Sequence, residues 1–197
     1  TPVAVTVRHG AGAKRGLLFK TAEAIETAGK VKTVVFDKTG TITKGEPEVT
    51  DIIPIEAADE KSLLAFAYSL ESKSEHPLAK AVMKKAEEEN IPSEDMGEFE
   101  AVSGKGVKAQ KNGVACLGGN IEFIRGYTEV SEEIKERATA LSKMGKTPLF
   151  FAENERLLGI IAVADVIREE SPKAVKKLKE MGIRVVMLTG DNEETAK

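Results

Sequence analysis

Residues 33–43 read TVVFDKTGTIT. The apolar, largely β-branched run at residues 31–36 predicts a short strand that is buried on both faces. This run delivers Asp37, followed by Lys-Thr-Gly-Thr. A carboxylate at the end of a buried strand is costly to place there unless its charge is used. Asp37 is therefore the first candidate for a functional side chain.

The composition is that of an ordinary globular protein. The 197 residues are 41% hydrophobic and carry a formal net charge of −3, with lysines and acidic residues interspersed. This balance argues against a nucleic-acid-binding protein, which usually has a basic face. The lone Cys116 excludes a disulfide framework and a paired-cysteine metal site. With a single cysteine, we expect a reducing, cytosolic environment. No apolar stretch approaches the ~20 residues that span a bilayer, so we expect no membrane insertion of this chain.

Three apolar runs end on carboxylates: VVFD at Asp37, IIAVAD at Asp165 and VVMLTGD at Asp191. A single such aspartate is more often a helix cap. In open parallel sheets, however, ligands bind outside the carboxyl ends of the strands, so three ends together favour a shared site. We expect an α/β domain built from residues 1–45 and 157–197, interrupted by an α+β insert with an antiparallel sheet over residues 46–156.

Turn and capping signals place the individual elements. The segment Lys111-Asn112-Gly113 separates two short alternating runs, and Asn-Gly is the strongest short hairpin signal. Thr21 and Ser171 are expected helix N-caps, and Gly29 is an expected helix end. We predict helices over residues 21–30, 61–72, 77–90, 131–144 and 174–181, and strands over residues 31–36, 48–55, 98–102, 106–110, 114–117, 149–152, 157–163 and 184–191.

Five sequence elements, in order along the whole chain, resemble one protein family. DKTGTIT (residues 37–43) resembles the phosphorylation motif of the P-type ATPases, which are pumps built on the haloacid dehalogenase-like fold. MLTGDN (187–192) resembles their second motif. SEHPLAKAV (74–82), SGKGV (103–107) and GGN (118–120) resemble the nucleotide-binding domain of the heavy-metal-transporting branch.

The resemblance implies a phosphorylation (P) domain in which Asp37 is the nucleophile that attacks the γ-phosphate of ATP. Lys38 would place a positive charge beside it, although a solvated lysine is the alternative. Gly40 would permit a tight turn that brings backbone N–H groups close to phosphate. The further roles implied are Mg²⁺ ligation by Asp37 and the Thr39 carbonyl, phosphate contacts by Thr41 and Thr189, loop shaping by Gly190 and Asp191, and a place near the nucleotide and hinge for Asp165.

In the nucleotide-binding (N) domain, the resemblance implies that Glu75 accepts a hydrogen bond from the adenine amine and that His76 orients or stacks on the ring. Because His76 precedes Pro77, it is also well placed as a helix N-cap. Gly104 and Gly106 would leave room for ribose and phosphates. In the GGN turn, Gly119 and Asn120 would complete the pocket, with Asn120 contacting the sugar or bridging to Gly104.

Thr39 separates a pump from a soluble phosphatase of the same superfamily. Such phosphatases carry a second aspartate at this position, where it acts as a general acid and base. Threonine cannot deprotonate water near neutral pH, and general acid–base help is worth about a hundred- to ten-thousand-fold. The phosphoenzyme should therefore persist. A soluble phosphatase and a non-catalytic nucleotide sensor remain the alternatives.

The resemblance also implies partners and a cargo. The parent pump would supply transmembrane and actuator domains, and this chain would be its cytoplasmic part, binding ATP with little or no turnover alone. VRHGAGAKRGLLFK (7–20) leans toward copper exporters, with zinc, cadmium or lead export as the alternative. His9 lacks ligand partners, and Cys116 lies in an apolar run expected to be buried, so neither predicts a transport-metal site.

Overall fold

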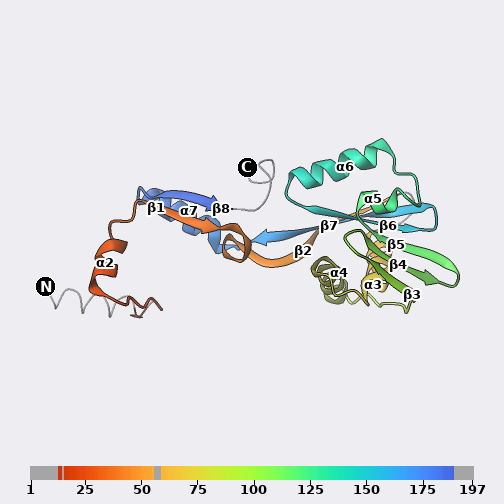
Figure 1. The fold of residues 1–197 in the computed structure, drawn as a ribbon, viewed down its shortest axis with the longest axis horizontal. Helices are drawn as coiled ribbons and strands as arrows, with labels where there is room; N and C mark the ends of the chain where they lie inside the picture. Colours follow the sequence, from red (N-terminus) through yellow and green to blue (C-terminus); the bar gives the residue numbers. More distant parts are fainter. Residues whose placement is uncertain (1–12, 15, 56–58, 189–197) are drawn as a thin grey trace. The chain divides into compact units, whose positions relative to one another are not determined.

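The structure, a computed structural model, describes residues 13–14, 16–55 and 59–188, and it divides into two compact units (Figure 1). Among the described residues, one unit takes those up to Asp37 together with Glu169–Leu188, and the other takes those within Lys38–Arg168. The expected functional residues Thr189, Gly190 and Asp191 lie outside the described parts, and so does His9. Residues 7–12 and 15 of the 7–20 segment do so too.

The first unit contains the strand that carries Asp37. Strand β1 (Thr33–Asp37) pairs in parallel with β8 (Arg184–Leu188), from Thr33 opposite Arg184 to Asp37 opposite Leu188. Helix α7 (Glu170–Glu180) connects back to β8, and α2 (Ala22–Ala28) precedes β1. The Thr21 hydroxyl accepts a hydrogen bond from the amide of Ala24, which confirms the expected N-cap, and Gly29 follows the last residue of the helix.

Two expectations for this unit are wrong. Strand β1 is not buried on both faces: its residues alternate between exposed and half-buried, and Val35 is 52% exposed. Within the described residues β1 pairs with one strand, β8. Ser171 is not the N-cap of α7, because the helix begins earlier, after Glu169. Pro172 is tolerated in the first turn, where N–H groups have no intrahelical partner.

The second unit is built on a six-stranded antiparallel sheet in the order β2-β7-β6-β5-β4-β3. The expected hairpin turn between β4 and β5 is confirmed, with Asn112 and Gly113 both at positive φ. The strands are β2 (Thr43–Pro54), β3 (Gly97–Val102), β4 (Gly106–Lys111), β5 (Val114–Gly119), β6 (Thr147–Glu153) and β7 (Arg156–Ile167).

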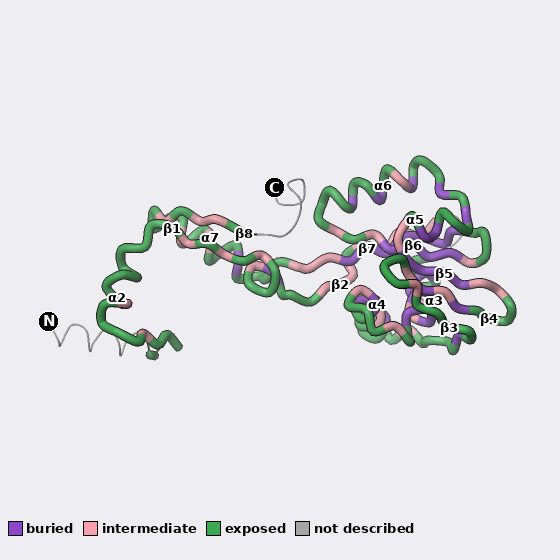
Figure 2. Tube along the Cα trace, in the orientation of Figure 1, coloured by how far each residue is buried: buried purple, intermediate pink, exposed green. Residues whose placement is uncertain are grey.

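Helices cover both faces of this sheet, α3 (Glu60–Glu71) and α4 (Pro77–Glu88) on one side and α5 (Ile121–Ile124) and α6 (Glu132–Lys143) on the other (Figure 1). Successive residues of one strand therefore enter different cores: Phe151 packs with the α3–α4 core and Phe150 with the α5–α6 core. Figure 2 shows the buried residues gathered between these layers.

Strand β7 corrects the expectation that three apolar runs end at one parallel edge. The run that includes Ile160 and Ile161 is apolar because β7 is sandwiched between the two helix layers, where Ile160 faces one core and Ile161 the other. β7 pairs antiparallel with both β2 and β6, and it continues past Asp165 to Ile167. Asp165 is thus within a strand of the antiparallel sheet.

Strands β2 and β7 pair from Thr43 opposite Ile167 to Pro54 opposite Gly159, with register shifts between Thr43 and Pro47 and between Val49 and Asp51. The compact units divide at Asp37 and Glu169, whereas the expected domain limits at residues 46 and 156 fall within β2 and at the start of β7. The division into a P domain of residues 1–45 and 157–197 and an N domain of residues 46–156 stays a prediction.

Candidate functional site

Asp37 is the last residue of β1, and its side chain is exposed. The turn that follows, Lys38–Ile42, departs from helical geometry at Thr39, which is extended, and at Gly40, whose φ is +72°. A Cβ on Gly40 would meet nothing within 4 Å, so this glycine is required by its backbone conformation and not by crowding. The tight turn expected at Gly40 is confirmed.

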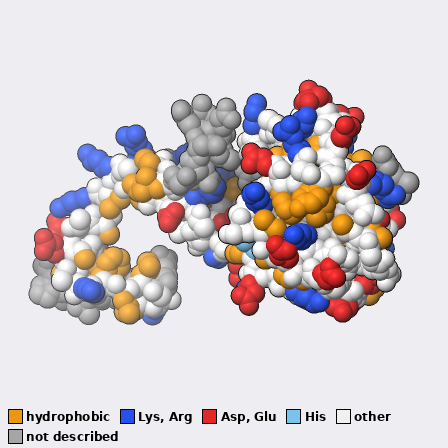
Figure 3. Space-filling model, turned by 45° about the vertical axis from the view of Figure 1, so that its right-hand side comes forward, with side chains coloured by type: hydrophobic (Ala, Val, Ile, Leu, Met, Phe, Trp, Pro, Cys, Tyr) orange, Lys and Arg blue, Asp and Glu red, His pale blue; other side chains and the backbone are white. Residues whose placement is uncertain are grey.

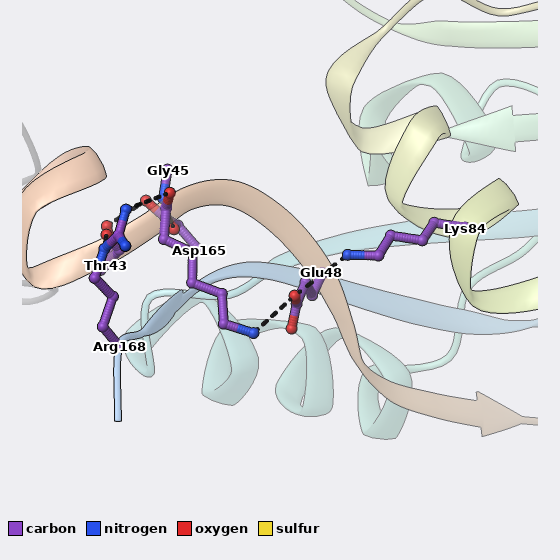
Figure 4. Close-up of polar contacts among 7 residues, drawn as sticks. Thr43, Gly45, Glu48, Lys84, Asp165 and Arg168 are labelled. Atoms are coloured by element: carbon purple, nitrogen blue, oxygen red, sulfur yellow. Dashed lines mark hydrogen bonds and ion pairs between the residues drawn. The ribbon is translucent and has the colours of Figure 1, made fainter. Parts of the chain in front are cut away.

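Thr43 and Asp165 hold this turn closed (Figure 4). The buried Thr43 hydroxyl accepts a hydrogen bond from the Gly40 amide at 3.2 Å. It lies 2.5 Å from Oδ2 of Asp165 and 3.0 Å from the Lys38 carbonyl oxygen, and the shorter contact takes its single proton. The other carboxylate oxygen of Asp165 accepts from the Gly45 amide at 2.8 Å. Asp165, which lies in β7, thus joins β7 to the first residues of β2.

Arg168, which the sequence analysis did not single out, contacts the same turn. Its Nε donates to the Thr43 carbonyl oxygen at 3.0 Å, and its backbone amide donates to the Ile42 carbonyl at 3.0 Å. One terminal nitrogen reaches the carbonyl oxygens of Lys44 and Gly40 at 3.4 and 3.5 Å. Backbone acceptors carry no residue-specific signal, so no pattern in the sequence could have predicted these bonds.

Asp37 and Thr39 offer oxygen donors of the kind Mg²⁺ prefers, a carboxylate and a backbone carbonyl. Mg²⁺ is commonly held by only one or two carboxylates together with waters and substrate phosphates, so this donor set fits the ion. No cluster of three or more metal-ligating side chains occurs among the residues that the structure describes. Thr41 is exposed. The catalytic and metal-binding roles of these residues stay predictions.

His76 and Glu75 are both exposed at the start of α4. The Nδ1 atom of His76 accepts a hydrogen bond from the Leu78 amide at 3.2 Å, so His76 is the N-cap of the helix, with Pro77 directly after it. The two roles weighed for His76 are compatible. An Nδ1 atom that accepts a hydrogen bond leaves the proton of the neutral ring on Nε2, which can then donate to a ligand.

Asn120 ties the two glycine turns together. Its Oδ1 caps the short helix α5 by accepting from the Phe123 amide at 2.8 Å, and its Nδ2 donates to the Gly104 carbonyl at 3.2 Å. The bridge expected between Asn120 and Gly104 is therefore present. Gly104 has a φ of +69° and open space where a Cβ would be, which leaves room for a ligand.

The space expected beside Gly106 is filled by backbone. Gly106 pairs with Gly119, and a Cβ on Gly106 would lie 2.1 Å from the Gly118 carbonyl oxygen. A Cβ on Gly119 would lie 2.4 Å from the Lys105 carbonyl oxygen. Because these positions have no Cβ, β4 and β5 can approach closely. This packing alone is a sufficient reason for glycine at both positions, with or without a ligand. Their part in nucleotide binding stays a prediction.

Glu71 is a buried carboxyl group that the sequence analysis missed. It is the last residue of α3, only 6% exposed, and burial raises its pKa to about 7. A hydrogen bond with Ser74 opposes this shift. A signal existed: Leu64, Ala67 and Glu71 recur at helical spacing on one buried face, so the glutamate occupies a core position. Glu71 lies directly before the loop that carries Glu75 and His76.

Figure 3 shows acidic and basic side chains intermixed over the visible face of the second unit, with apolar side chains gathered in one area. None of the helices in the described part of the chain is both long and apolar enough to span a bilayer.

Comparisons with known proteins agree with these features. The model of the haloacid dehalogenase-like hydrolase family matches residues 31–197. The chain is 45% identical over its whole length to a probable copper-exporting P-type ATPase of Archaeoglobus fulgidus, of which it covers 24%. It is 40% identical, again over its whole length, to a probable cadmium-transporting ATPase of Alkalihalophilus pseudofirmus, of which it covers 28%.

A solved structure shares the fold. The crystal structure of a zinc-transporting PIB-type ATPase in the E2.Pi state matches 99% of this chain with a TM-score of 0.91 and 34% sequence identity, and the chain covers 32% of it. The chain thus spans about a quarter to a third of the length of these relatives. It belongs to the haloacid dehalogenase-like hydrolase family, and within that family its relatives are the heavy-metal P-type ATPases.

Proposed function

We propose that this chain is the ATP-binding and phosphorylation portion of a heavy-metal P-type ATPase. The observation that carries the proposal is Asp37, an exposed carboxylate at the end of a parallel strand. The turn that follows it, Lys38–Ile42, is held by hydrogen bonds to Thr43, which in turn bonds to Asp165. Similarity to heavy-metal P-type ATPases along the whole chain supports it. In this account the chain lies on the cytoplasmic side of the membrane, joined to transmembrane and actuator domains.

The reaction is a transfer of phosphoryl from ATP to Asp37. A carboxylate oxygen attacks the γ-phosphorus, the bond from that phosphorus to the β–γ bridging oxygen breaks, and ADP leaves with the electron pair. An acyl phosphate remains on Asp37. The Asp37 carboxylate and the Thr39 carbonyl would hold Mg²⁺, which, when bound, neutralises charge on the phosphates. Thr39 supplies no general base, so water attacks the acyl phosphate slowly.

The insert binds the nucleotide. His76 donates from Nε2 or stacks on adenine, and Gly104 and Asn120 border the sugar and phosphates. Glu75 is the proposed acceptor for the adenine amine, and Glu71 is a second candidate, because a hydrogen bond to a buried carboxyl group is stronger than one to a group exposed to solvent. The loss of ATP affinity on Glu71→Ala, with Glu75→Ala neutral, would favour Glu71 over Glu75.

The cargo is proposed to be Cu⁺, with Zn²⁺, Cd²⁺ or Pb²⁺ as the alternative. The relatives include both a copper exporter and a cadmium transporter, so similarity alone does not decide between them. Phosphoenzyme formation by the full-length pump should depend on Cu⁺ and not on Zn²⁺ or Cd²⁺. The reverse dependence would replace the cargo and leave the rest of the proposal intact.

Two measurements test the function. The 197-residue chain should bind ATP in calorimetry and hydrolyse it with little or no turnover. The full-length pump, incubated with γ-labelled ATP, should form an acid-stable, hydroxylamine-sensitive phosphoenzyme that Asp37→Asn abolishes while ATP binding remains. Prompt phosphate release without a trapped intermediate would instead indicate a soluble phosphatase of the same family. An Asp37→Asn variant with unchanged behaviour would indicate a nucleotide sensor.

A further inference from the structure

Backbone groups of the turn after Asp37, and of the residues that follow it, take part in several hydrogen bonds. The amides of Gly40 and Gly45 and the carbonyls of Ile42, Thr43 and Lys44 all bond to Thr43, Asp165 or Arg168. Gly40 and Gly45 both have positive φ, so this segment has much conformational freedom to lose on ordering. Contacts from outside the turn must therefore fix its path.

Those contacts come from two opposite charges at the end of β7. Asp165 accepts from Thr43 and from Gly45, while Arg168 donates to the carbonyls of Thr43, Lys44 and Gly40. Among the residues that the structure describes, no ion pair joins Asp165 to Arg168. Both charged side chains instead form hydrogen bonds with the turn and with the residues directly after it. Hydrogen bonds to charged groups are about twice as strong as neutral ones, and the guanidinium fork adds directional specificity.

Arg168 is itself exposed and Asp165 is half-buried, so it is the burial of Thr43 that distinguishes these bonds from the neighbouring ion pairs. Glu48 pairs with Lys44 at 3.0 Å and with Lys84 of α4 at 3.5 Å, but these side chains are 27–50% exposed (Figure 4). Exposed pairs contribute little. The Thr43 hydroxyl, by comparison, is in a residue only 2% exposed, and it is the group on which Gly40 and Asp165 converge.

We propose that Arg168, Asp165 and Thr43 are positioning residues for phosphoryl transfer, which hold the Thr39–Gly40 backbone in its reactive path. This inference rests on the proposed function. None of the three needs to touch substrate. Reaction at Asp37 depends on near-ideal placement of the groups around it, and a misplacement of about 1 Å can cost roughly a hundredfold in rate. ATP affinity, which the insert supplies, should be unaffected.

The test is a separation of rate from affinity in the full-length pump. Arg168→Met should lower the rate of phosphoenzyme formation at saturating ATP by at least about tenfold, with the KM for ATP unchanged within about twofold. Arg168→Lys should recover little, because an ammonium lacks the planar fork. Arg137→Lys is the matched control, because Arg137 is an exposed arginine of α6 that pairs with Glu133. This variant should behave as the wild type.

Two substitutions at Thr43 separate the role of its hydroxyl from that of its shape. Thr43→Val removes the hydroxyl and keeps the shape, so it should reduce the rate like Arg168→Met, whereas Thr43→Ser restores the hydroxyl and should restore the rate. A wild-type rate in Arg168→Met and Thr43→Val would overturn the proposal. A parallel loss of ATP binding would also overturn it, because the residues would then maintain the whole unit and not the turn.

A second readout does not require turnover. In the 197-residue chain, the Gly45 amide should exchange with deuterium at least about tenfold faster in Asp165→Ala than in the wild type, while amides of β4 and β5 keep their rates. Unchanged exchange at Gly45 would show that Asp165 does not hold the turn. If the wild-type pump forms no phosphoenzyme, the proposed function fails, and this exchange measurement still decides whether the turn is fastened as described.

Discussion

Burial of Glu71 makes a quantitative prediction about pH. Burial raises the pKa of this carboxyl group from 4.5 to about 7 in the folded chain, and the group is only 6% exposed. The folded state therefore binds the proton more tightly than the unfolded state. Stability from this group is fully present below pH 4.5 and is lost as the pH rises toward 7. At about 1.4 kcal/mol per pH unit, the loss amounts to about 3 kcal/mol.

The perturbation is Glu71→Gln, which is neutral at every pH. The variant and the wild type should have similar free energies of unfolding at pH 4.5, and at pH 8 the variant should be more stable by up to about 3 kcal/mol. Both tyrosines, Tyr68 and Tyr127, lie in the second unit, so tyrosine fluorescence during urea titration follows the unit that contains Glu71. The exposed Glu75→Gln is the control and should leave the curve unchanged.

Two outcomes would refute this reasoning. The difference between variant and wild type could stay constant from pH 4.5 to pH 8, which would mean that Glu71 titrates as an exposed carboxyl group. Alternatively, Glu71→Gln could lose stability at pH 8, which would mean that the ionised form is the one that the surrounding groups stabilise.

Further substitutions test the remaining parts of the site and the core. Gly106→Ala should lower the Tm sharply or prevent folding, because its Cβ would lie 2.1 Å from a backbone oxygen, whereas Gly104→Ala should cost only about 1 kcal/mol for its positive φ. His76→Asn should keep the helix cap and the Tm but weaken ATP binding in calorimetry, whereas His76→Ala should lose both, with about 1 kcal/mol of stability. Phe151→Ala should destabilise the second unit by about 3–5 kcal/mol in urea titration, because Phe151 is completely buried in the α3–α4 core.

Local sequence signals predicted much of this structure. Thr21 caps its helix, Asn112 and Gly113 form the hairpin turn, and Asp37 ends a parallel strand, because each depends on a few neighbouring residues. The expected order of strands and helices in the insert is confirmed, apart from the short helix α5. One turn of helix leaves too little periodicity to be recognised.

What the sequence could not predict depends on contacts between distant segments. Asp165 was expected at a parallel sheet edge, because an apolar run that ends in aspartate looks the same whether its strand is covered by helices in a parallel or an antiparallel sheet. Arg168 bonds to carbonyl oxygens of residues that precede it by more than 100 positions. The close approach of β4 and β5 at Gly106 and Gly119 could not be read from the sequence either, and the expected part of these glycines in nucleotide binding stays a prediction.

The most direct test of the account is the chemical identity of residue 37 after reaction with ATP. In the full-length pump, acid quenching followed by borohydride reduction and peptide mass spectrometry should place the modification on Asp37, and the Asp37→Asn variant should bind ATP without being modified. Phosphate found on any other residue, or turnover that persists in Asp37→Asn, would contradict the central claim that this carboxylate receives the phosphoryl group.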